Sequence, residues 1–265
     1  MNETDFFQEM ILCLSESKLS TCSSLFQGKP AASELLMGYA VLQALSSRFF
    51  IPLHFMEVTL RNKIHAALLQ VYSTKDMKRR IRDHFGEDKE PSLWYTWMPS
   101  KEDTKKNITN AMEYAEKNAA ISGRTPTCGD VISELTLGTW IKILGEYMDI
   151  KHKLFYWDKA VDLIFPNRCH MRRRGILQQL SEVNIMRNRL FHHEPIWKAK
   201  GVSTFEEAVK KLWEQLWLIH DVIAWMSPAM WMFIEKVIDK EFFDEAYTKG
   251  TLPFKSTTLK SEGDV

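Results

Sequence analysis

The sequence of 265 residues contains little glycine, proline and cysteine, and its basic and acidic residues almost cancel. It contains 11 Gly, 9 Pro and 4 Cys. Long stretches rich in Leu, Met, Ala, Lys and Glu, with so little glycine between them, favour helices over strands and turns. The cysteines are scattered and show no close C-x-x-C spacing, which fits reduced thiols in a cytoplasm. A formal net charge of +1 means that any nucleic-acid surface must be local.

Targeting and membrane signals are also lacking. The first residues, MNETDFFQEMILCLSESK, have no basic, apolar and small-residue regions of a secretion signal, so we expect mature sequence here. The longest apolar stretch, around 216–238, is interrupted by His220, Asp221, Pro228 and Glu235. We therefore expect a buried helical hairpin and a cytoplasmic protein with no membrane partner. No Walker, Rossmann or G-x-S-x-G pattern is present, and no cofactor is expected.

Apolar residues recur at helical spacing along most of the chain, and 45% of the residues are hydrophobic. This pattern predicts an all-α protein with one helical domain over 1–252 and a mobile polar tail over 253–265. Residues 83–101 predict a loop insertion whose large aromatic side chains are pinned onto the body. The predicted helices lie near 34–45, 54–72, 102–120 and 130–148, from 172 toward Pro195, and as a pair over 203–246.

The stretch RNRLFHHEP, residues 187–195, crowds polar side chains into the end of an apolar helix. Arg187 and His192 are five residues apart and diverge by about 140° on a helix, a gap that the long arginine side chain can narrow. Cleaving RNA without a metal requires a group that takes a proton from the 2′-hydroxyl and a group that stabilises negative charge on phosphorus. Histidine and arginine can supply these two roles. The alternative is a helix C-terminal cap in which Glu194 pairs with Arg189 or Arg187.

The extended stretch RNRLFHHEPIW resembles the signature of the Abi-like (abortive infection) family within the HEPN ribonuclease superfamily. Arg187, Asn188 and His192 match its R-x-x-x-x-H motif, in which Asn commonly follows the Arg. Two further stretches resemble the family, namely EVTLRNKI at 57–64 and VISELTLGTWIKIL at 131–144.

The resemblance implies an α-helical HEPN-type bundle with additional helices and a metal-independent endoribonuclease, often a homodimer that joins two motifs. It also implies a role in phage defence or as a toxin, restrained in some members by a small RNA or a protein antitoxin. Other members only bind RNA or proteins. Under this resemblance Arg187 and His192 are the catalytic pair, and the supporting residues are Asn188, His193, Glu194, Arg61 and Asn62.

Arg61 and Asn62 also have a structural interpretation, because Glu57 lies four residues before Arg61 and could form an intrahelical ion pair with it. His65 has core-like neighbours, so we expect a satisfied structural histidine. The KRRIR stretch at 78–82 is interpreted as a solvated face.

The segment RCHMRRR, residues 168–174, concentrates positive charge just before the predicted catalytic helix. It could steer an RNA backbone, or its arginines could pair with acidic neighbours such as Glu134 or Asp162. We predict RNA contact. The predicted RNA-binding residues are Arg168, Arg172, Arg173, Arg174 and Arg189.

A metal site is not expected, because the adjacent His192, His193 and Glu194 would point about 100° apart on a helix. Three functions compete: an endoribonuclease, a non-catalytic RNA- or protein-binding helical module, and a metal-dependent hydrolase. For a homodimer, several tryptophans could supply either core or interface surface. They are Trp213, Trp217, Trp225 and Trp231.

Overall fold

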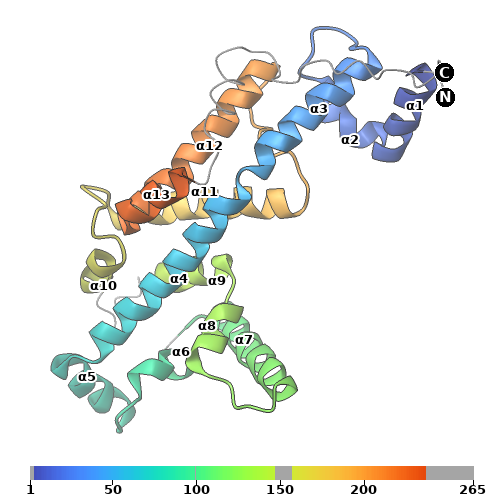
Figure 1. Ribbon diagram of the computed structural model, residues 1–265. Helices are drawn as coiled ribbons and strands as arrows, with labels where there is room; N and C mark the ends of the chain where they lie inside the picture. Colours follow the sequence, from blue (N-terminus) through green and yellow to red (C-terminus); the bar gives the residue numbers. More distant parts are fainter. Residues whose placement is uncertain (1–2, 99, 147–156, 237–265) are drawn as a thin grey trace. The chain divides into compact units, whose positions relative to one another are not determined.

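The computed structural model describes residues 3–98, 100–146 and 157–236, which form helices and turns and contain no β-strand (Figure 1). The protein is therefore all-α, as the sequence predicts. The predicted ends of the last helix and the polar tail lie outside the described residues. The elements are α1 (Glu3–Leu14), α2 (Glu16–Ser23), α3 (Ala32–Ser47), α4 (Phe50–Tyr72), α5 (Lys75–Phe85), η1 (Pro91–Leu93), α6 (Trp94–Trp97), α7 (Glu102–Ile121), α8 (Cys128–Glu134), α9 (Leu137–Glu146), α10 (Trp157–Ile164), α11 (Arg173–Phe191), α12 (Phe205–Met226) and α13 (Pro228–Glu235).

The chain divides into two compact units. Unit 1 comprises Met1–Ile51, Arg189–Trp217 and Glu235–Val265, and unit 2 comprises Pro52–Asn188 and Leu218–Ile234. The boundaries fall within α4, α11, α12 and α13, so each of these helices contributes residues to both units.

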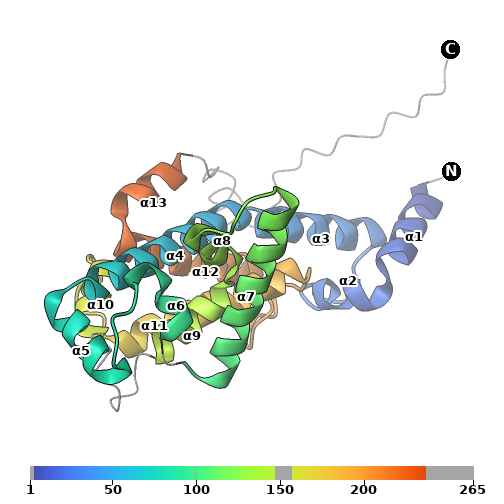
Figure 2. The ribbon, with the colours of Figure 1, turned by 90° about the horizontal axis from the view of Figure 1, so that it is seen from below.

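In unit 1, helices α1, α2 and α3 pack against one another (Figures 1 and 2). The first turn of α3 is capped by Glu34, whose carboxylate accepts from the backbone N–H of Ala31 at 3.0 Å. Gly38 allows a close approach in this unit, since a Cβ there would lie 2.8 Å from Cζ of Phe26. The buried apolar side chains of α3 are Leu36, Val41, Leu42 and Leu45.

In unit 2, helix α7 packs on α8 and α9 (Figure 2). Helix α5 is capped at its start by Thr74, whose hydroxyl accepts from the N–H of Met77, and at its end by Gly86 in the left-handed region. The predicted insertion at 83–101 contains the short helices η1 and α6. Its Trp94 is fully buried, with its ring centroid 6.0 Å from that of Trp140. An aromatic side chain of this segment therefore packs against the rest of the protein, as expected, but it is held on a short helix and not on a loop.

The helix predicted over 130–148 is two helices, α8 and α9, in the structure. Leu135 between them is extended, with φ −72° and ψ 125°. The hydroxyl of Thr136 accepts from the N–H of Thr139 at 3.3 Å and so caps the start of α9. A local side-chain cap thus overrides the apolar periodicity that predicts one continuous helix.

Two side chains cap the start of α8. Thr127 is the N-cap, and Asp130 sits at the third helical position of a capping box. Its carboxylate accepts from the backbone N–H of Thr127 at 2.7 Å. The backbone N–H groups of Thr127 and Asp130 are thereby each satisfied by the other residue's side chain.

By length and composition, the stretch Ala32–Tyr72 would qualify as a membrane span, and 44% of its most apolar window is buried within the structure. Core helices pass the same test. All four cysteines are free thiols: Cys13 and Cys169 are exposed, Cys128 is partly buried and Cys22 is buried. Burial raises the pKa of the Cys22 thiol to about 11.

Candidate functional site

Arg187 lies in the last turns of α11 and belongs to unit 2. Its Nε is 3.8 Å from Oε2 of Glu57 on α4, and both side chains are mostly withdrawn from solvent. Its Nη1 donates to Oδ1 of the neighbouring Asn188 at 3.3 Å. The structure thus brings the predicted phosphate-binding arginine to the EVTLRNKI stretch, more than a hundred residues away in sequence.

The intrahelical ion pair that the spacing of Glu57 and Arg61 allows is replaced by two contacts to other helices. Glu57 faces Arg187, and Nη1 of Arg61 donates to the backbone carbonyl of Ser133 on α8 at 3.5 Å. Both residues lie on one face of α4, because they are four apart. Asn62 is exposed, on a different face.

The third stretch of the resemblance, around LTLGTW, packs beside α11. A Cβ at Gly138 would lie 3.6 Å from Nδ2 of Asn184, which precedes Arg187 by three residues. Thr139 is buried and accepts from Nδ2 of Asn107 on α7 at 3.2 Å, and Trp140 is fully buried. Within unit 2, the 57–64 and 131–144 stretches therefore contact each other through Arg61, and each contacts α11, through Glu57 and Gly138.

His192 and His193 lie in unit 1, in the turn that follows α11. The N–H of Glu194 donates to the carbonyl of Arg189 at 2.8 Å, and the N–H of His193 donates to the carbonyl of Leu190 at 3.0 Å. These two bonds form a Schellman motif, with His193 in the left-handed region at φ +56°. The helix ends before Pro195, as predicted, and both imidazoles are exposed.

Arg189 holds this turn in place. Its Nη1 donates to the carbonyl of Lys198 at 3.0 Å, its Nη2 donates to the carbonyl of Pro195, and its Nε lies 3.6 Å from Oε2 of Glu194. The alternative of a helix C-terminal cap thus describes Arg189 well. Its predicted role in RNA binding would have to compete with these three contacts.

Lys18 is a residue that the sequence reasoning missed. It lies on α2 and donates from Nζ to the backbone carbonyl of His193. Its separation of 175 residues from His193 leaves no signal in the sequence pattern. The contact ties the histidine turn to the N-terminal helices of unit 1.

The basic segment before α11 is partly engaged in structural contacts. Arg168 donates from Nη2 to Oδ1 of Asp162 at 2.8 Å and from Nη1 to the carbonyl of Met171 at 2.6 Å. This is the acidic pairing that the structural alternative described. Arg172 and Arg174 are exposed, whereas Arg173 is half-buried. Arg172 and Arg174 are therefore the accessible arginines of this segment.

His65 is a satisfied structural histidine, as expected. Its Nδ1 accepts from Nε1 of Trp94 at 3.0 Å, and burial lowers its pKa. The KRRIR stretch behaves as a solvated face, because Arg79 and Arg80 pair with Asp76 and Arg82 pairs with Asp88.

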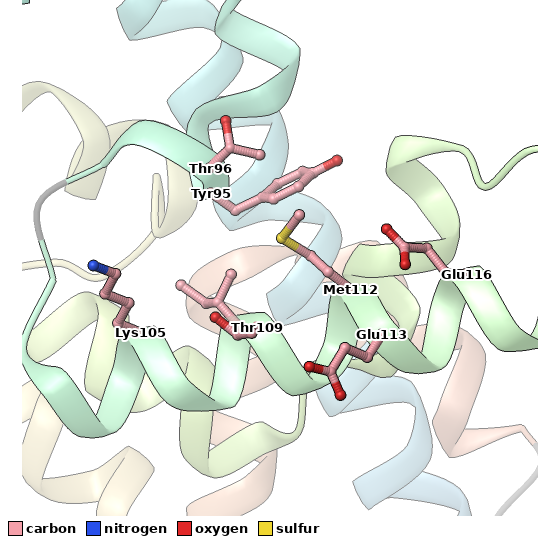
Figure 3. Close-up of a pocket in the computed structure, with 8 residues that line it drawn as sticks. Tyr95, Thr96, Lys105, Thr109, Met112, Glu113 and Glu116 are labelled. Atoms are coloured by element: carbon pink, nitrogen blue, oxygen red, sulfur yellow. The ribbon is translucent and has the colours of Figure 1, made fainter.

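A separate open pocket of about 340 Å³ lies between α6 and α7 (Figure 3). It is lined by Tyr95 and Thr96 on one side, with Lys105, Glu113 and Glu116 on the other. Two carboxylates against one ammonium make an unfavourable surface for a polyanion. This pocket is therefore not assigned to the candidate site.

The predicted interface tryptophans differ in exposure. Trp217 is 41% exposed, and its ring centroid lies 6.0 Å from that of Trp213. Trp213 and Trp225 are half-buried. Trp231 is buried and packs edge-on against His220 at 4.5 Å, so it belongs to the core. Of the four, Trp217 offers the most surface.

Comparison of the chain with protein-family models, with curated proteins and with solved structures gave no match. The family resemblance therefore rests on the three sequence stretches themselves.

Proposed function

We propose that this protein is a metal-independent endoribonuclease of the HEPN type, related to the Abi-like family. The main support for the proposal is the position of Arg187, whose half-buried guanidinium is contacted by Glu57 and Asn188. Five residues later the chain presents an exposed imidazole, His192, at the end of the same helix. A held guanidinium followed by an accessible imidazole supplies the two groups that metal-free RNA cleavage needs.

In the proposed reaction, the imidazole of His192 takes the proton of the ribose 2′-hydroxyl. The 2′-oxygen attacks phosphorus, the bond to the 5′-oxygen breaks, and that oxygen receives a proton from the second His192 of the proposed homodimer as it leaves. The products are a 2′,3′-cyclic phosphate and a 5′-hydroxyl end. Arg187 binds the non-bridging oxygens, where negative charge builds up in the transition state. Asn188 helps to hold the guanidinium through its Oδ1.

The proposed substrate is RNA, since the reaction uses its 2′-hydroxyl. Arg172 and Arg174 are exposed on the segment that leads into α11 and can attract the phosphate backbone. The proposed context is phage defence by abortive infection or a toxin–antitoxin pair, and the proposed assembly is a homodimer. These proposals follow the family resemblance.

The proposal is tested by incubating the purified protein with end-labelled single-stranded RNA in excess EDTA. We expect cleavage with 2′,3′-cyclic phosphate ends. His192→Ala and Arg187→Lys should each lower the rate by at least about a hundredfold. His84→Ala is a matched control, because His84 is an exposed histidine on α5, outside both the motif and the basic segment 168–174; it should cleave like the wild type.

Other outcomes would point to the competing functions. RNA binding without cleavage would identify a non-catalytic binding module. Cleavage that EDTA abolishes would identify a metal-dependent hydrolase. Equal activity of the wild type and His192→Ala would remove His192 from the mechanism.

A further inference from the structure

Glu57 contacts the guanidinium of Arg187 at Nε, the guanidinium nitrogen closest to the backbone. The carboxylate Oε2 is 3.8 Å from Nε, an ion-pair distance, and the two side chains are 25% and 29% exposed respectively. Farther along the guanidinium, Nη1 of Arg187 donates to Oδ1 of Asn188. The guanidinium plane is therefore contacted on two sides before any RNA arrives.

The contact between Glu57 and Arg187 joins α4 to α11, so it does not follow from the spacing of residues along a single helix. Arg61 is the cation that helical spacing offers to Glu57, yet its Nη1 donates to the carbonyl of Ser133 on α8. The carboxylate of Glu57 is thereby left to the arginine on α11.

We infer that Glu57 is the positioning residue for Arg187, a role that rests on the proposed ribonuclease function. A guanidinium binds phosphate through a planar fork of donors, so it works only when its plane is correctly turned. The carboxylate of Glu57 lies 3.8 Å from Nε, the nitrogen nearest the chain, and its charge favours the orientation in which this edge of the guanidinium faces Glu57. It thereby orients the terminal nitrogens that are to meet the scissile phosphate, and it lowers the conformational entropy lost when RNA binds.

Glu57 does not touch substrate in this arrangement, so its removal should act through Arg187. The isosteric Glu57→Gln keeps the shape and removes the charge. We expect it to lower kcat by about tenfold to a hundredfold, with little change in KM, because a misaligned arginine fails most in the transition state. Glu57→Asp keeps the charge and should retain more activity than Glu57→Gln.

Glu182→Gln is the matched control. Glu182 is an exposed glutamate on α11 whose carboxylate accepts from Gln178. Its loss should leave both kcat and KM unchanged. Thermal unfolding of every variant shows that the rates refer to folded protein.

The decisive measurement is a double-mutant cycle under single-turnover conditions. In an Arg187→Ala background, Glu57→Gln should cause no further loss of rate, because the group on which it acts is gone. If the two losses multiply, Glu57 acts independently of Arg187 and the inference is wrong.

Two other results would also overturn it: a folded Glu57→Gln variant with wild-type kcat, or a folded Glu57→Asp variant as impaired as Glu57→Gln. The failure of the proposed function is distinguishable, since it would show as a wild-type protein that does not cleave RNA at all. That result would remove the positioning role together with the activity.

Discussion

The ammonium of Lys18 on α2 donates to the backbone carbonyl of His193 in the turn after α11. The carbonyls at the end of a helix carry partial negative charge, so a cation is stabilising there. Through this bond the first helices of the chain support the turn that carries both exposed histidines.

Lys18→Ala should therefore loosen the histidine turn. We expect the free energy of unfolding to fall by roughly 0.5–1.5 kcal/mol, the usual contribution of one hydrogen bond. Under the proposed function, cleavage should fall severalfold as well. Urea titration and the RNA assay measure the two effects. Lys29→Ala, at an exposed lysine of the same unit, is the control and should change neither.

His193 has a positive φ of 56°, a conformation that glycine adopts without strain. His193→Gly should keep or raise the free energy of unfolding, by up to about 1 kcal/mol. His193→Val should lower it by about 1–2 kcal/mol, because a β-branched side chain is strained there. Thermal or urea unfolding of the two variants tests this order. A Val variant as stable as the Gly variant would contradict the turn geometry.

Substitution of the two histidines should also affect the cleavage rate to different extents. His193→Ala is expected to be milder than His192→Ala, since only His192 fits the R-x-x-x-x-H spacing. Single-turnover rates of the two alanine variants compare them. Equal losses would mean that the assignment of the base to His192 is wrong.

A homodimer is expected to bring two Arg187–His192 sets to one cleft, because one histidine cannot readily serve as both base and acid in one step. Light scattering should show a dimer. Mixing wild type with a large excess of His192→Ala subunits should suppress activity below the fraction of wild-type protomers. Activity strictly proportional to that fraction, or a monomeric active enzyme, would exclude a shared site.

The start of α8 should show a pH dependence. Arg124 and the N–H and hydroxyl of Thr127 hydrogen-bond the carboxylate of Asp130 and hold its pKa below its ordinary value of 3.8. A lowered pKa contributes stability that is complete above about pH 4 and is lost as the pH falls toward the folded-state pKa. Asp130→Asn should therefore be less stable than the wild type at pH 7. Urea titrations at several pH values should show the difference shrinking below pH 4, and equal differences at pH 7 and pH 2 would contradict it.

The class of the fold and the ends of several elements follow from the amino-acid sequence alone. Apolar residues at helical spacing predict α3, α4, α7 and α12 because each helix must bury one face, and Pro195 limits α11 because proline disfavours helix in the residue before it. The structural role of His65 was also predicted, since its neighbours in the sequence are typical core residues.

The pairing of charged side chains, in contrast, depends on how the helices pack. The carboxylate of Glu57 has Arg61 within reach on its own helix and Arg187 within reach on another, and sequence spacing can see only the first. The same holds for Lys18 and His193, whose contact depends on how two distant segments pack. Local periodicity encodes which face of a helix is buried, whereas ion pairs between helices depend on packing that no single segment contains.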